Sequence, residues 1–118
     1  MRCASADDSG GVTAEIAVAL PSLALVLAVA LAVVQAAAAH LACVDSARVG
    51  ARALARGESD TEVLSLIARV APEPAEARLS RGDGMARVTV TTRVPIGPSF
   101  TVPIVVGGEA ATPLEPGT

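Results

Sequence analysis

Aromatic side chains are almost absent from this sequence, which has Phe100 but no Trp and no Tyr among 118 residues. Lysine is absent too, so all nine basic residues are Arg, and the formal net charge is −3. Surfaces that bind nucleic acid usually combine a basic patch with aromatic side chains that stack on bases. Because this sequence has neither feature, we expect no direct contact with nucleic acid.

Residues that bind metals or carry out catalysis are also scarce. His40 is the only histidine, and the cysteines are Cys3 and Cys43, whereas a structural zinc site needs about four Cys, His or carboxylate ligands. The sequence contains no Ser-His-Asp, Cys-His, phosphate-loop or paired-carboxylate arrangement. We therefore expect no catalytic residue, metal, cofactor or small-molecule substrate, and no enzymatic activity. Cys43 is expected to be a buried small side chain or a site of intermolecular pairing.

One long apolar run dominates the N-terminal half. Ile16 to Ala39 has 24 residues without a charge, and such a helix is about 36 Å long at ~1.5 Å per residue. The hydrocarbon core of a bilayer is ~30 Å thick. Residues 11–40 are therefore predicted to form a transmembrane helix, with Pro21 as the site of a kink.

The helical pattern continues beyond the apolar run. Arg48, Arg52 and Arg56 recur every four residues and so share one helix face, and Gly57 is a typical C-terminal stop. We expect a helix from Gly11 to Arg56, with 1–10 as a disordered leader and 41–57 as an extramembrane continuation. The arginine face is either a solvated, snorkelling surface or a docking surface.

The remaining residues, 58–118, are predicted to form a small module outside the membrane. Ser59 and Glu62 have capping-box spacing before a short helix that ends at Pro72. Three strands are expected after it, at Ala75–Ser80, Met85–Ile96 and Phe100–Val106. In the second strand the residues alternate, so that one face carries Val88, Val90, Thr92 and Val94 and the other carries Thr89, Thr91 and Arg93. The tripeptide Arg81-Gly82-Asp83 occurs in integrin ligands, but here it lies in a hairpin turn between strands. With a loose tail from Gly107, the fold class is α+β: a long N-terminal helix, a short helix and a three-stranded antiparallel meander.

Glu15 is the residue most informative about function. It places a carboxylate at the start of an otherwise uncharged membrane helix, and a charge at the bilayer centre costs roughly 2.5–3.5 kcal/mol or more. Such a residue is usually retained because a partner compensates it. Cleavage after Gly10 would make Gly11 the first residue of the mature chain and Glu15 its fifth.

A short polar leader, a glycine, a glutamate at mature position five and an apolar helix together resemble the class III signal of type IV prepilins. Within that superfamily the sequence resembles the TadE-like minor pilins of the tight-adherence (Flp) pilus, actinobacterial type. The residues that carry this resemblance are Gly10, Val12, Thr13, Ala14, Glu15, Ala17, Leu20 and Pro21, with the run from Cys43 to Gly57. The leader departs from the usual basic pattern, because Arg2 is opposed by Asp7 and Asp8.

The resemblance implies a function for the chain. Gly10 and Gly11 would flank the cut made by a prepilin peptidase, and Glu15 would pair with the N-terminal amine of a neighbouring subunit. The chain would be a minor pilin or pseudopilin in the bacterial plasma membrane, single-pass, with its module outside the cytoplasm. Its partners would be other pilin subunits and the Tad assembly machinery. The positive-inside rule alone would place Arg48, Arg52 and Arg56 in the cytoplasm, so the two arguments predict opposite topologies.

Two alternatives for the N-terminal half stay open. A signal peptidase could release a secreted small binding module by cutting near Ala38, where several small residues follow one another. Lipoprotein anchoring is not favoured: Leu41-Ala42-Cys43 resembles part of a lipobox, but His40 occupies a position where an aliphatic residue is expected. The chain could also be an unprocessed single-span membrane protein.

Overall fold

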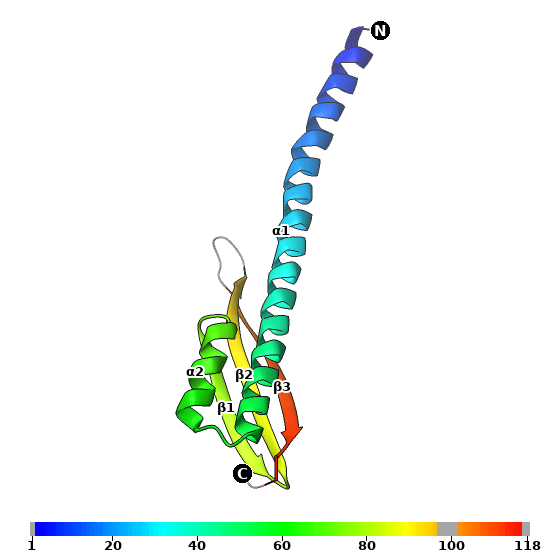
Figure 1. The fold of residues 1–118 in the computed structure, drawn as a ribbon. Helices are drawn as coiled ribbons and strands as arrows, with labels where there is room; N and C mark the ends of the chain where they lie inside the picture. The colour runs from blue at the N-terminus through cyan, green and yellow to red at the C-terminus, as the bar shows by residue number, and fades with distance from the viewer. Residues whose placement is uncertain (1, 97–101, 117–118) are drawn as a thin grey trace. The chain divides into compact units, whose positions relative to one another are not determined.

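The computed structural model describes residues 2–96 and 102–116 of the chain. The elements in order are α1 (Arg2–Ala55), α2 (Asp60–Val70), β1 (Ala75–Gly82), β2 (Met85–Ile96) and β3 (Val102–Pro113) (Figure 1). The chain divides into two compact units, Met1–Val33 and Val34–Thr118. The second unit, called the module below, contains the last part of α1, all of α2 and the sheet. The predicted α+β class is confirmed.

Helix α1 begins earlier than expected and ends as expected. It starts at Arg2 rather than Gly11, so the prediction of a disordered leader is wrong for the described residues 2–10; Met1 lies outside them. Ala, Asp and Ser in this stretch are compatible with helix, and an apolar helix downstream supplies the nucleus on which they extend. At the other end Gly57 has a φ of 85°, and Gly57 and Glu58 donate backbone hydrogen bonds to Leu54 and Ala53. These are the two bonds of a Schellman stop, with glycine in the left-handed position.

Helix α2 is fixed at its start by the predicted capping box. The Glu62 backbone N–H donates to the Ser59 hydroxyl at 3.3 Å, and the Ser59 backbone N–H donates to the Glu62 carboxylate at 3.1 Å. The helix ends at Val70, two residues before Pro72. Val63 and Ile67 are buried, one helical turn apart, and face the core.

The hairpin between β1 and β2 is closed by Asp83 and Gly84, which have φ values of 53° and 72°. Two central residues with positive φ make a type I′ turn, for which Asp-Gly is a favoured sequence. Gly82 and Met85 are the pair that flanks this turn. The predicted hairpin is therefore confirmed, with β1 two residues longer than expected.

The third strand differs from the prediction. It was expected at Phe100–Val106, followed by a loose tail; the structure has β3 at Val102–Pro113, paired antiparallel with β2 along its whole length. Phe100 and Thr101 lie outside the described residues. The Gly107-Gly108 pair favours a loose tail in the sequence, but glycine in a strand can instead mark a close approach of another backbone. Gly108 has that role here, since a Cβ built on it would meet the backbone of Val44 in α1.

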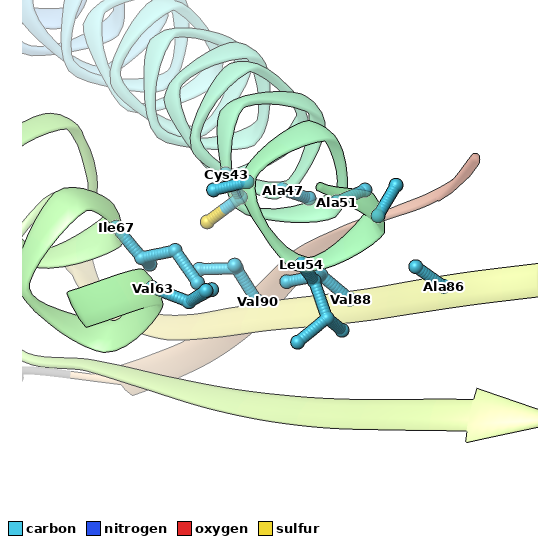
Figure 2. Packing of buried hydrophobic residues seen from close by; sticks show 11 residues of the cluster. Cys43, Ala47, Ala51, Leu54, Val63, Ile67, Ala86, Val88 and Val90 are labelled. Atoms are coloured by element: carbon cyan, nitrogen blue, oxygen red, sulfur yellow. The ribbon is translucent and has the colours of Figure 1, made fainter. Parts of the chain in front are cut away.

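The core lies on one face of the sheet, whose strand order is β1-β2-β3. Strand β2 alternates as predicted: its even-numbered residues from Ala86 to Val94 are buried, whereas Arg87 and Arg93 are exposed. Figure 2 shows side chains of α1 and α2 gathered above Val88 and Val90 of β2. The α1 side of this core consists of small residues at helical spacing, with one larger side chain: Cys43, Ala47, Ala51 and Leu54. Small side chains let the helix lie close to the sheet.

Candidate membrane-spanning and assembly site

The first unit is a bare helix. Every residue from Gly10 to Leu31 is exposed, and the stretch from Gly10 to Ala55 is long and apolar enough to cross a membrane. Its large apolar side chains, among them Leu23, Val26 and Leu31, are more than half exposed in the isolated chain. Apolar residues on all sides are typical of a helix that is surrounded by lipid or by other helices.

Glu15 lies on this bare helix, and its side chain is exposed. No described residue forms an ion pair with it. Gly11 lies one helical turn before it, within the same continuous helix. The structure thus places a carboxylate at the start of the apolar stretch, with no charged partner from the described part of its own chain.

Two small residues surround the predicted cleavage position. Gly10 and Gly11 are both in α1 and both exposed, and a Cβ built on either one would meet nothing within 4 Å. Neither glycine is therefore required by packing inside this chain.

Pro21 lies within α1, and the helix continues on both sides of it. Proline has no N–H, so the hydrogen bond to the carbonyl four residues earlier is missing at this point. The Ser22 hydroxyl donates to the Val18 carbonyl at 2.8 Å, which satisfies this hydroxyl within the helix.

The predicted arginine face is exposed, although its members differ. Arg48 and Arg52 are on α1 and have no ion pair among the described residues. Arg56 lies just beyond the helix and forms an ion pair with Glu58 at 2.6 Å. The exposure fits a solvated face, and docking at this face stays a prediction.

Cys43 is a core residue. Its side chain is 0% exposed, and Figure 2 shows it in the cluster formed by α1, α2 and β2. Burial raises the pKa of the Cys43 thiol, because an apolar surrounding disfavours the charged thiolate. The prediction of a buried small side chain is confirmed, and the folded monomer does not offer this thiol for pairing.

The remaining candidates from the sequence are metal-binding residues and the integrin-type tripeptide Arg81-Gly82-Asp83. The described residues contain no group of three or more His, Cys, Asp or Glu that could hold a metal ion. In the integrin-type tripeptide, the Arg81 guanidinium donates to the Asp60 carboxylate at 2.8 Å and to the Glu58 carbonyl at 3.2 Å. Arg81 therefore joins the hairpin to the start of α2, a role that the sequence pattern did not reveal.

Comparisons with protein-family models, with curated proteins and with solved structures find no match for this chain. The functional argument therefore rests on the residues and geometry described above.

Proposed function

We propose that this chain is a single-pass membrane subunit of a type IV-like pilus or a related export machine, of the TadE-like minor pilin kind. One observation carries the proposal: α1 exposes an uncharged surface on all sides from Ile16 to Leu31, and the carboxylate of Glu15 immediately precedes this surface. The resemblance of the segment from Gly10 to Pro21 to class III prepilin signals supports the same assignment.

The apolar surface accounts for the membrane part of the proposal. A Leu, Ile or Val side chain left in water costs about 1.5–3 kcal/mol relative to a buried one, and this helix exposes many such side chains. Lipid and the apolar helices of other subunits both remove this cost. A filament subunit uses the two environments in turn, first in the membrane and then in the assembly.

Glu15 accounts for the assembly part. A carboxylate in lipid is costly, but an ammonium brought beside it offsets much of the desolvation of both groups, and removing one strands the other. Cleavage after Gly10 would create such an ammonium at Gly11. Because Gly11 and Glu15 are about 6 Å apart along a helix, a neighbour shifted by about one turn would place its amine beside Glu15.

The proposal includes the location and partners of the chain. The helix would anchor it in the bacterial plasma membrane, with the module on the extracytoplasmic side and other pilin subunits as neighbours. A prepilin peptidase would process it, and the Tad machinery would assemble it. We propose no enzymatic activity.

The mature N-terminus distinguishes this function from its rivals. Intact-mass measurement and N-terminal sequencing of the protein, purified from both the membranes and the culture medium of its native cells, are expected to give a membrane-bound chain that begins at Gly11. A chain beginning near Ala39 would instead establish a secreted module released by signal peptidase. A chain that keeps residues 1–10 would have no amine at the depth of Glu15 and would overturn the assembly mechanism.

A further inference from the structure

The end of the module at which α1 enters it carries an exposed apolar surface. Outside α1, the exposed large apolar side chains of the described residues are Leu64, Val70, Ile104 and Val105. Val105 is 64% exposed and Ile104 is 41% exposed, and Pro103 beside them is exposed too. Val70 is the last residue of α2. Ile104 and Val105 are the third and fourth residues of β3.

Contacts within the module show that β3 runs in the same direction as α1. Gly108 lies against α1 at Val44, since a Cβ built on Gly108 would be 2.5 Å from the Val44 backbone nitrogen. Further along, the Glu115 backbone N–H donates to the Ala55 carbonyl at 3.1 Å. Residues earlier in β3 therefore lie beside residues earlier in α1.

Because β3 runs in the same direction as α1, the residue of α1 that lies beside Val105 can be calculated. Val105 is three residues before Gly108, which is about 10 Å along a strand. The helix covers about 10 Å in about seven residues, so Val105 is level with the part of α1 near residue 37. That part belongs to the apolar run from Ile16 to Ala39.

A hollow between α1 and the sheet also places Val105 level with the last turns of the apolar run. Gln35 and Ala39 of α1 line one hollow of about 210 Å³ together with Pro72, Glu73 and the segment from Thr92 to Pro95. Arg93 in that segment is the ladder partner of Val105. Two residues further along β2, Pro95 pairs with Pro103. Both strands therefore reach the level of the last turns of the apolar run.

The bilayer thickness places this level in the headgroup region. A hydrocarbon core of ~30 Å is crossed by about 20 helical residues. Counted from Ile16, it ends near residue 35. The remaining turn, up to Ala39, lies among the lipid headgroups, where amphipathic protein surfaces are buried by about 5–10 Å.

We propose that the end of the module formed by Val70, Pro95, Pro103, Ile104 and Val105 rests on the outer lipid surface. This inference rests on the membrane anchoring proposed above. Arg93 and Glu73 are both exposed at this end, and their opposite charges give no net attraction to anionic lipid. The contact therefore depends on apolar area, and uncharged phosphatidylcholine is a sufficient partner. The opposite end of the sheet carries the Arg87–Glu109 ion pair and the small residue Ala111 on its outer face.

The absence of tryptophan from the chain permits a direct test. The full-length protein is reconstituted in phosphatidylcholine vesicles with bromine near the carbonyl end of the acyl chains, and the quenching of one introduced tryptophan is measured. Val105→Trp is the test variant. Ala111→Trp is its matched control, because Ala111 is exposed on the same face of β3, about 20 Å along the strand. Leu25→Trp lies near the middle of the apolar run, and it tests the anchor itself in parallel vesicles whose acyl chains carry bromine near the methyl end.

We expect strong quenching of Leu25→Trp and a loss of emission for Val105→Trp on the order of three times that of Ala111→Trp, because only the first two sites reach the lipid. If Leu25→Trp is quenched and Val105→Trp behaves like Ala111→Trp, the surface contact is disproved and the anchor stands. Strong quenching of Ala111→Trp would also disprove the contact as stated, since the whole sheet would then touch lipid. If Leu25→Trp is not quenched, the anchor fails, and this inference fails with it.

Discussion

Gly108 of β3 lies directly against the backbone of Val44 in α1: a Cβ at position 108 would be 2.5 Å from the Val44 nitrogen and 2.6 Å from its Cα. Real Cβ atoms do not approach backbone this closely, so only glycine fits. The neighbouring residues on α1 are small as well, Cys43 and Ala47 among them, and both are fully buried. The module is thus held together by a close approach of a helix and a strand, where it has few large side chains to bury.

Gly108→Ala is expected to destabilise the module by about 2 kcal/mol or more, because the methyl group must push β3 away from α1 and loosen a packed core. The measurement is the urea concentration at which Cys43 becomes reactive to a maleimide in the full-length protein in detergent, with Cys3 replaced by Ser. Gly82→Ala is the control, since a Cβ there meets nothing within 4 Å. Equal midpoints for the two variants would contradict the close approach.

The Cys43 thiol is expected to react at least about tenfold more slowly than an exposed thiol, because it is fully buried and the reactive species is the thiolate. Asp45→Cys in a Cys43→Ala background is the matched control, since Asp45 is exposed on the same helix. Rapid labelling of Cys43 in the absence of denaturant would show that the core is open.

A pH dependence follows from the same burial. The folded state raises the pKa of the Cys43 thiol, so at alkaline pH the folded chain keeps a proton that the unfolded chain loses. The free energy of unfolding is therefore expected to fall as the pH rises above the ordinary thiol pKa, and to be unaffected by this group below it. The Cys43→Ala variant should lack this component of the alkaline loss in urea unfolding followed by circular dichroism.

Arg81→Ala is expected to lower the free energy of unfolding by about 0.5–1 kcal/mol, the size usual for an exposed ion pair with an added hydrogen bond. Arg81 joins the hairpin to Asp60 and to the Glu58 carbonyl across the start of α2. Arg78→Ala is the control, because Arg78 is exposed on the same strand and has no ion pair among the described residues. The difference between the two variants should shrink in high salt; a difference that persists would mean that Arg81 acts mainly by packing.

Local signals predicted most of the fold because they act over a few residues. The capping box at Ser59 and Glu62, the glycine stop at Gly57 and the alternation along β2 each depend on neighbours in the sequence, and each is present in the structure. The two errors concern segments whose state depends on distant or extended context. Residues 2–10 are helical in continuity with a long helix, and β3 extends through Gly107-Gly108 because α1 lies against it.

Some of the candidate functional features could be predicted from the sequence, and others are visible only in the structure. The carboxylate at the start of an uncharged helix is visible in the sequence, since position and charge alone define it. The arrangement around Arg81 is not visible, because Arg81 and Asp60 are brought together only by the folding of α2 beside the hairpin. The level of Val105 along α1 is equally hidden, since it depends on the register of β3 against the helix. Sequence patterns therefore identified an apolar segment long enough to span a membrane. The exposed apolar side chains level with the end of that segment could be recognised only from the three-dimensional structure.

Glu15 provides the sharpest functional prediction. Glu15→Ala should leave membrane insertion intact, because the apolar run from Ile16 to Ala39 is unchanged and a charge has been removed from its edge. It should reduce incorporation into filaments by about tenfold or more, since the amine of a neighbouring subunit would lose its partner at a cost of about 3–5 kcal/mol.

The measurement is the ratio of sheared filament material to membrane-bound protein in cells that express the variant. Glu76→Ala, which removes an exposed carboxylate from β1 of the module instead, is the control and should keep the normal ratio. Because insertion and incorporation are measured on the same cells, a Glu15→Ala protein that inserts and is incorporated normally would show that this carboxylate has no role in assembly.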